Sequence, residues 1–227
     1  MVFQSFNLFP QYTALGNVTL APLLASGGKN EDEIVSAGRK LLDQMGLSDR
    51  MGNYPHQLSG GMRQRVVIAI AISCNPDLLI CDEPTTALDV TIQAKILELI
   101  KKLQVDHGIS VIYITHDLGV VAKVADFVNV MYAGKIVEVG NIEEIFYDPK
   151  HPYTWGLLSA MPDLETDDSR LYTIPGSPPN LLHEVKGDAF APRNQFALKV
   201  DSMVEPPMFQ VSQLFHFILE LKHAKID

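Results

Sequence analysis

The sequence has few cysteines, no long hydrophobic run and few basic residues, and each deficit excludes a class of protein. Its two cysteines, Cys74 and Cys81, lie in apolar stretches, so we expect buried free thiols in a reducing compartment, with a disulfide between them as the alternative. The longest apolar run, residues 66–73, is far shorter than the roughly 20 residues that a membrane-spanning helix needs. The N-terminus lacks the pattern of a secretory signal peptide. We therefore expect a protein of cytoplasmic character that reaches a membrane only through a partner.

The shortage of Lys and Arg gives a formal net charge of −9, from 18 basic and 27 acidic residues. Binding to a nucleic-acid backbone or an anionic membrane surface needs a basic face, so neither is expected as the main function. The composition is otherwise typical of a globular protein of one or two domains, with no internal repeat.

Hydrophobic periodicity predicts four helices and leaves the first 25 residues as loop and short helix. The helices are expected at residues 31–45, 62–73, 90–105 and 118–125. Gly46 is expected to end the first of them, and Ser59 to cap the second after a turn at residues 57–61.

Two short apolar runs, residues 78–81 and 109–115, predict strands buried on both faces, as in a parallel sheet. Residues 127–132 and 136–139 predict a hairpin. Strands that alternate with helices indicate an α/β fold. Eight prolines follow Pro149 and predict a loop-rich C-terminal region, which ends in an amphipathic helix at residues 212–225.

Polar residues follow both predicted parallel strands. Asp82 and Glu83 follow the first strand, and His116 and Asp117 follow the second. Ligands bind beyond the carboxyl ends of strands in such sheets, so the two pairs can face one crevice. In phosphoryl-transfer sites one carboxylate orients Mg²⁺ and another takes a proton from the attacking water. Solvated acids at strand ends are the alternative.

Residues 58–65 read LSGGMRQR and precede a predicted helix. Two glycines let the backbone approach a ligand closely, and a serine at a helix N-terminus adds a hydroxyl to free N–H groups that attract phosphate. A plain serine-capped helix is the alternative.

Five motifs in order resemble those of ATP-binding cassette proteins over about residues 1–150. The LSGGMRQR run resembles the signature motif, usually written LSGGQ, and residues 78–84 (LLICDEP) resemble the Walker B strand. The other three are residues 87–89 (ALD), which resemble the D-loop, His116 in ITHD, which resembles the switch histidine, and Gln4 in VFQ, which resembles the Q-loop glutamine. The resemblance implies a P-loop NTPase-like ATP-binding cassette core.

In that family two nucleotide-binding subunits pair head to tail with ATP between them. The resemblance implies that Asp82 binds Mg²⁺, that Glu83 is the general base and that His116 contacts the γ-phosphate and the attacking water. It implies that Gln4 touches metal and water while sensing the membrane partner. Ser59, Gly60 and Gly61 would close on the ATP of the other subunit, and Asp89 would line the seam. A satisfied strand-end histidine and simple loop packing are the alternatives for His116 and Gln4.

The run Gly-x-x-x-x-Gly-Lys-[Ser/Thr], the phosphate-binding Walker A loop, does not occur in the sequence, and residues 27–30 (GGKN) lack its spacing. In the family this loop precedes the Q-loop. We therefore expect the chain to correspond to a family member without its first third, and to be inactive alone.

The C-terminal part narrows the type of transporter. Residues 148–158, 174–181 and 187–193 resemble the extension of oligopeptide and dipeptide importer ATPases. Many relatives carry an iron–sulfur cluster there. Asp188 and Asn194 stand where its cysteines are expected, so no cluster is predicted. Residues 3–10 look more like polar amino-acid importers.

The resemblance divides the chain into a partial cassette domain at residues 1–147 and a peptide-importer extension at 148–227. Within the first, residues 1–73 hold the Q-loop and helical subdomain, and 74–147 hold Walker B, the switch histidine and the hairpin. It implies transmembrane permease subunits as partners, an extracellular substrate-binding protein acting indirectly, and a place on the cytoplasmic face of the plasma membrane.

Three alternatives to a peptide importer remain. One is an importer ATPase for amino acids or another small solute. Another is a cassette ATPase of DNA repair, chromosome organisation or translation, against which the short spacing from Ser59 to Asp82 and the lack of heptads argue. The third is a non-catalytic fragment that acts as a binding module.

Overall fold

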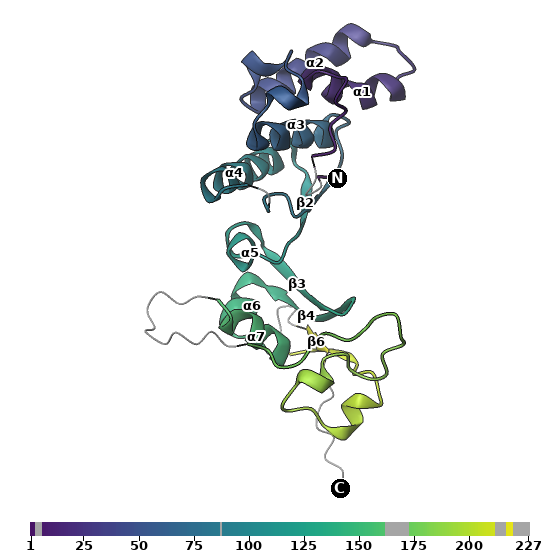
Figure 1. Cartoon of the computed structure of the whole chain (residues 1–227), viewed down its shortest axis with the longest axis vertical. Coiled ribbons are helices and arrows are strands. Elements are labelled where there is room, and N and C mark those ends of the chain that lie inside the picture. The colour runs from purple at the N-terminus through teal and green to yellow at the C-terminus, as the bar shows by residue number, and fades with distance from the viewer. Residues whose placement is uncertain (3–5, 87, 162–172, 212–216, 220–227) are drawn as a thin grey trace. The chain divides into compact units, whose positions relative to one another are not determined.

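The computed structural model describes the chain except residues 3–5, 87, 162–172, 212–216 and 220–227. The chain divides into two compact units, unit 1 (Met1–Val124) and unit 2 (Ala125–Asp227), each with its own apolar core (Figure 1). The sequence-based division at residue 147 stays a prediction, because compactness alone does not mark a functional boundary.

Unit 1 contains the four predicted helices, each within two residues of its expected ends. The α-helices are α1 (Ala14–Ala25), α2 (Glu31–Gln44), α3 (Gly60–Ile72), α4 (Val90–His107) and α5 (Leu118–Val124), with short 3₁₀ turns at Ser48–Arg50 and Pro55–Gln57. Gly46, with φ +66°, follows the end of α2 as predicted. The turn predicted at residues 57–61 is wrong in part, since Gly60 and Gly61 form the first turn of α3.

The strands β1 (Leu78–Asp82) and β2 (Ser110–Ile114) pair in parallel, as predicted, with Asp82 opposite Ile114. Val2 forms a parallel bridge with Cys81 on β1. The prediction that both strands are buried on two faces is wrong. Leu79 is fully buried against the helices, whereas Ile114 on β2 is 48% exposed. Within the described residues, the helices cover one face of this small sheet.

The core of unit 1 contains apolar side chains from the helices α1 to α4 and from strand β1. Ile96, Ile100 and Leu103 of α4 are buried there with residues of α3 and β1. Cys81 is buried among them, and burial raises the pKa of its thiol to about 12. Cys74 is exposed, so its predicted burial is wrong because it lies just beyond the end of α3. Both thiols are free.

Unit 2 is built on an antiparallel sheet with the strand order β3–β4–β6–β5. Its strands are β3 (Phe127–Tyr132), β4 (Lys135–Asn141), β5 (Met208–Gln210) and β6 (Phe217–Leu219). The predicted hairpin is β3–β4, which turns at Ala133 and Gly134, both with positive φ. The helix predicted at residues 212–225 is wrong over β6, and the rest of that range lies outside the described residues.

A buried carboxylate joins this sheet to the helical part of unit 2, which contains α6 (Ile142–Tyr147) and α7 (Pro152–Ser159). Glu138 of β4 is fully buried and accepts hydrogen bonds from the N–H groups of Lys150 (2.6 Å) and His151 (3.1 Å) and from the hydroxyl of Thr154. Its charge thus lies at the N-terminus of α7, where a negative charge is favourable.

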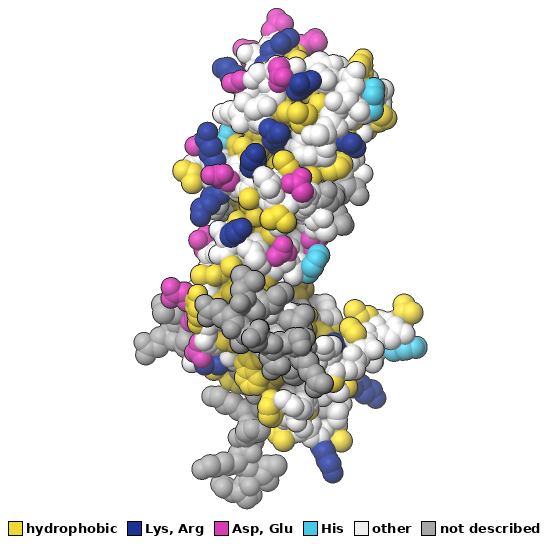
Figure 2. Space-filling model, turned by 60° about the vertical axis from the view of Figure 1, so that its left-hand side comes forward, with side chains coloured by type: hydrophobic (Ala, Val, Ile, Leu, Met, Phe, Trp, Pro, Cys, Tyr) yellow, Lys and Arg dark blue, Asp and Glu magenta, His cyan; other side chains and the backbone are white. Residues whose placement is uncertain are grey.

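Two surface properties complete the description. None of the helices in the described part of the chain combines the length and the hydropathy needed to cross a membrane. Figure 2 shows acidic and basic side chains interspersed over the visible face of unit 1.

Candidate functional site

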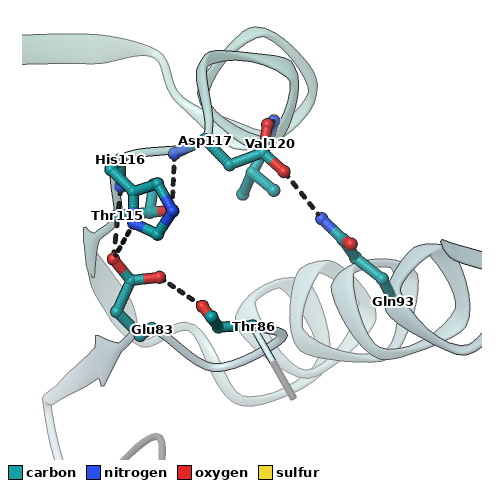
Figure 3. A network of polar contacts seen from close by, with 7 residues as sticks. All are labelled: Glu83, Thr86, Gln93, Thr115, His116, Asp117 and Val120. Carbon is teal, nitrogen blue, oxygen red and sulfur yellow. Dashed lines mark hydrogen bonds and ion pairs between the residues drawn. The ribbon is translucent and has the colours of Figure 1, made fainter. Parts of the chain in front are cut away.

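The residues that follow β1 and β2 meet at one end of the small sheet in unit 1 (Figure 3). Oε1 of Glu83 lies 2.6 Å from Nδ1 of His116 and also accepts a hydrogen bond from the His116 backbone N–H at 3.3 Å. Its second carboxylate oxygen accepts a hydrogen bond from the hydroxyl of Thr86. The parallel register therefore brings together the two residues that the sequence placed in a common crevice.

The backbone of Glu83 is held in an unusual conformation. Its φ is +48°, a region that a residue with a side chain adopts at a cost in free energy. Its N–H donates a hydrogen bond of 2.9 Å to the carbonyl of Ile114 at the end of β2. The strained turn is thus fixed by the neighbouring strand, and it directs the carboxylate toward His116.

The contacts of Glu83 set its protonation. Partial burial alone would raise the pKa of Glu83, but hydrogen bonds from Thr86 and His116 outweigh burial, so its pKa is lowered. The carboxylate is therefore ionised at neutral pH, as a general base must be. His116 itself is largely exposed, which leaves the rest of its ring open to a ligand.

A second carboxylate, Asp117, ties this site to helix α4. Its Oδ2 accepts a hydrogen bond of 3.1 Å from Nε2 of Gln93, and its Oδ1 accepts from the N–H groups of Gly119 and Val120 at the start of α5. Partial burial opposes these bonds, which nevertheless lower the pKa of Asp117. Asp117 thus serves as a structural link between β2, α4 and α5.

Asp82 is the last residue of β1 and is half-buried next to Glu83. Its backbone N–H donates a hydrogen bond of 2.8 Å to the carbonyl of Val2. Carboxylate oxygens are the ligands that Mg²⁺ prefers, and this ion commonly takes one or two of them together with water and phosphate oxygens. The position and chemistry of Asp82 therefore fit a magnesium ligand.

The signature run forms the N-terminus of α3. Ser59 is the N-cap residue, and its Oγ accepts a hydrogen bond from the N–H of Met62 at 3.4 Å. Gly61 packs so closely on α4 that a Cβ atom there would lie 2.6 Å from Cγ2 of Ile92. At Gly60 an added Cβ would make ordinary contacts. Gly61 therefore allows α3 to approach α4 closely, whereas packing does not require a glycine at position 60.

One of the predicted site residues in the described part of the chain, Asp89, lies apart from this contact network. Asp89 is the N-cap of α4, where its Oδ1 accepts a hydrogen bond of 2.9 Å from the N–H of Ile92. Gln4 lies outside the described residues. Of its neighbours, Phe6 lies beneath the guanidinium of Arg63 on α3, 5.4 Å from the ring centre.

The sequence did not indicate Thr86 or Gln93 as site residues. Thr86 follows Glu83 by three positions, the spacing at which a turn brings side chains together, so this signal was available. Gln93 follows Asp89 by four positions and therefore lies on the same face of α4, but its contact with Asp117 depends on how α4 packs.

Comparisons with known proteins identify the family of this chain. The family described as ABC transporter matches residues 1–86, and the family described as oligopeptide/dipeptide transporter, C-terminal region, matches residues 137–200. The matched region at residues 1–86 belongs to the ATP-binding cassette transporter family. The predicted α/β, P-loop NTPase-like fold class and the resemblance to peptide-importer ATPases are thereby confirmed.

Three curated relatives give the extent of the similarity. The chain is 52% identical over 202 residues to the oligopeptide transport ATP-binding protein AmiE of Streptococcus pneumoniae, covering 88% of this chain and 57% of AmiE. It is 60% identical over 183 residues to OppD of Bacillus subtilis, covering 79% and 51%. It is 54% identical over 202 residues to the dipeptide transport ATP-binding protein DppD of Lactococcus lactis, covering 87% and 58%. The chain thus spans about half the length of these relatives.

Proposed function

We propose that this chain is part of an ATP-hydrolysing subunit that powers the import of oligopeptides or dipeptides across the cytoplasmic membrane. The observation that carries the proposal is the Glu83–His116 pair, held at the carboxyl ends of two parallel strands. The names of the relatives, which are oligopeptide and dipeptide transport proteins, support peptides over amino acids or another small solute.

Glu83 acts in this proposal as the general base. Its ionised carboxylate takes a proton from the water that attacks the terminal phosphate, while His116 and Thr86 hold it in place. His116 contacts the water and the γ-phosphate through the exposed part of its ring. Asp82 holds Mg²⁺, which when bound neutralises charge on the phosphates. Gln4 is proposed as a further contact to metal and water.

The remaining site residues act across a head-to-tail dimer. Ser59, Gly60 and Gly61 present the N-terminus of α3 to ATP that is bound by the other subunit. Asp89 caps α4 and lines the seam between the subunits. In this arrangement the signature run faces one nucleotide and Glu83 of the same subunit hydrolyses the other. Ser59 and Glu83 therefore do not need to contact each other.

The partners and the location follow from the family. Transmembrane permease subunits hold the protein at the cytoplasmic face of the plasma membrane, and an extracellular substrate-binding protein acts through them. An iron–sulfur cluster remains unexpected, since Asp188 and Asn194 use their side chains to accept hydrogen bonds from the N–H groups of Phe190 and Phe196. Nucleic acid remains unexpected as a partner.

The test is made on a protein in which the Walker A segment of a relative precedes residue 1. We expect Mg²⁺-dependent ATP hydrolysis that falls by ~10²–10⁴-fold in the Glu83→Gln variant, because a positioned general base is lost. Glu98→Gln, on the exposed side of α4, is the matched control and should leave the rate unchanged. Activity of Glu83→Gln within a few-fold of the parent would overturn the proposal. The 227-residue polypeptide alone should not hydrolyse ATP, because it has no phosphate-binding loop.

A further inference from the structure

A buried glutamine joins the helix of the signature run to the loop that carries Glu83. Gln64 lies in the second turn of α3 and is 1% exposed. Its Nε2 donates a hydrogen bond of 2.6 Å to the carbonyl oxygen of Pro84, the residue directly after Glu83. This hydrogen bond links a side chain of α3 to the loop after β1, and it is buried in the interior of unit 1.

The chemistry of Pro84 fixes the orientation of the Gln64 amide. A carbonyl oxygen can only accept a hydrogen bond, so the Gln64 atom that faces it must be the amide nitrogen. Oε1 of Gln64 is then buried, and among the described residues it has no hydrogen-bond partner. Burying an unpaired acceptor is unfavourable, and an apolar side chain of similar size would avoid it. Packing alone therefore does not account for a glutamine here.

The loop that Gln64 holds is sensitive to small movements. Glu83 keeps its left-handed φ of +48° because the bond from its N–H to Ile114 and the contacts with Thr86 and His116 surround it. A shift of the Pro84 carbonyl would rotate the neighbouring peptide and change the direction of the Glu83 carboxylate.

The other end of the connection is the signature end of α3. Ser59 caps the helix one turn before Gln64, so the two move together as parts of one rigid element. A displacement of the Ser59 end therefore reaches Pro84 through Gln64.

We propose that Gln64 is a positioning residue that couples the two nucleotide sites of the dimer. When the signature end of α3 closes on nucleotide in one site, the Gln64–Pro84 bond adjusts Glu83, which works in the other site. This inference rests on the proposed function, because it takes Glu83 as the base and Ser59 as a contact to the partner's nucleotide.

The test measures phosphate release from MgATP at one site of a mixed dimer, in the same protein with a Walker A segment. The second subunit is prepared in two versions. With Glu83→Gln, the site that contains its own Walker A loop binds ATP but does not hydrolyse it. With its Walker A lysine replaced, that same site stays empty. The ratio of the two rates reports how much filling the second site stimulates the first. We expect a ratio of about fivefold or more in the parent, and less than about twofold when the first subunit carries Gln64→Leu.

The controls separate coupling from general damage. Gln64→Met also lacks the donor and should lower the ratio in the same way. Ile72→Val, at the far end of α3, removes a buried methyl group and should leave the ratio unchanged. A purely structural role for Gln64 would lower both rates equally and keep the ratio, which would overturn the proposal, as would a parent ratio near one.

A dimer with Glu83→Gln in both subunits distinguishes the two proposals. If it still hydrolyses ATP, the assignment of the base fails whatever Gln64 does. If it is inert while the ratio is insensitive to Gln64, the coupling proposal alone fails.

Discussion

Oε1 of Glu83 lies 2.6 Å from Nδ1 of His116, although 33 positions separate the two residues. The contact forms because the parallel strands β1 and β2 end side by side, with Asp82 opposite Ile114. Thr86 donates a hydrogen bond to the second carboxylate oxygen, so both oxygens of Glu83 are oriented by neighbouring side chains.

Replacing His116 should change both the rate and the pH dependence of hydrolysis. In the protein with a Walker A segment, we expect His116→Ala to lower kcat by about 10- to 100-fold, since a hydrogen bond to a charged group contributes about 1.5–3 kcal/mol. Because His116 helps to lower the pKa of Glu83, its loss should raise that pKa and move the acid limb of the pH–rate profile to higher pH. His107→Ala, at the exposed end of α4, is the control. An unchanged acid limb would argue against the contact.

Ser59 should act on the ATP of the partner subunit. We expect Ser59→Arg to block dimer closure, because a bulky cation replaces the hydroxyl at the N-terminus of α3. Nucleotide binding by the monomer should survive. A mixed dimer with Ser59→Arg in one subunit and a lost Walker A lysine in the other confines both defects to one site and should keep activity, provided that each parental site is competent alone. Both changes in one subunit should spoil both sites. Equal rates for the two arrangements would show that Ser59 does not act in trans.

Gly61→Ala should destabilise unit 1. The added methyl group would lie 2.6 Å from Cγ2 of Ile92, and overpacking of this kind costs about 1–3 kcal/mol. Gly60→Ala is the matched control, since its methyl group would lie 3.6 Å from Leu88. Urea unfolding should show a lower midpoint for Gly61→Ala only, and Ile92→Ala should cost less in the Gly61→Ala background than in the parent. Additive effects would mean that the two side chains do not compete for the same space.

His151 should make unit 2 less stable in mild acid. Burial lowers the pKa of His151 to about 4, against the opposing effect of Glu138, whereas the unfolded chain titrates near 6.5. The unfolded state therefore binds more protons between these values, so stability is full above about pH 6.5 and falls as pH decreases, by up to roughly 3 kcal/mol near pH 4.

Denaturant unfolding of His151→Asn tests this dependence. Asparagine can still accept the N–H of Tyr153 that caps α7 but does not titrate, so the loss of stability between pH 7 and pH 5 should shrink. His183→Asn, at an exposed position, should keep the parental pH dependence. The same acid loss in His151→Asn and the parent would refute the assignment.

The sequence predicted the parts of the site that depend on local order. The strand ends could be predicted at residues 81 and 115, each within one residue of the observed ends at Asp82 and Ile114, because the apolar runs stop there. Parallel pairing then allowed the residues after the two strands to face one crevice. Ser59 could be predicted as a cap because serine at that position satisfies a free N–H. These inferences rest on short stretches of chain and one rule of sheet topology.

The missed features depend on packing between distant segments. The apolar runs of β1 and β2 do not indicate which elements pack on each face of the sheet, so the exposure of Ile114 could not be predicted. The contact of Gln64 with Pro84 spans 20 positions and has no periodic signal. The run at residues 217–219 is short enough to suit a helix or a strand, and pairing with β4 and β5 decided for the strand.

The carboxylate of Glu138 has a practical consequence for the design of hybrid transporters. It belongs to strand β4, yet its hydrogen bonds hold the backbone of Lys150 and His151 at the start of α7. A graft that joins a foreign extension at residue 147 would pair this acid with a new partner, and a mismatch would leave a charge buried without donors. A hybrid should therefore replace the whole of unit 2, starting at residue 125, so that Glu138 and helix α7 come from the same parent protein.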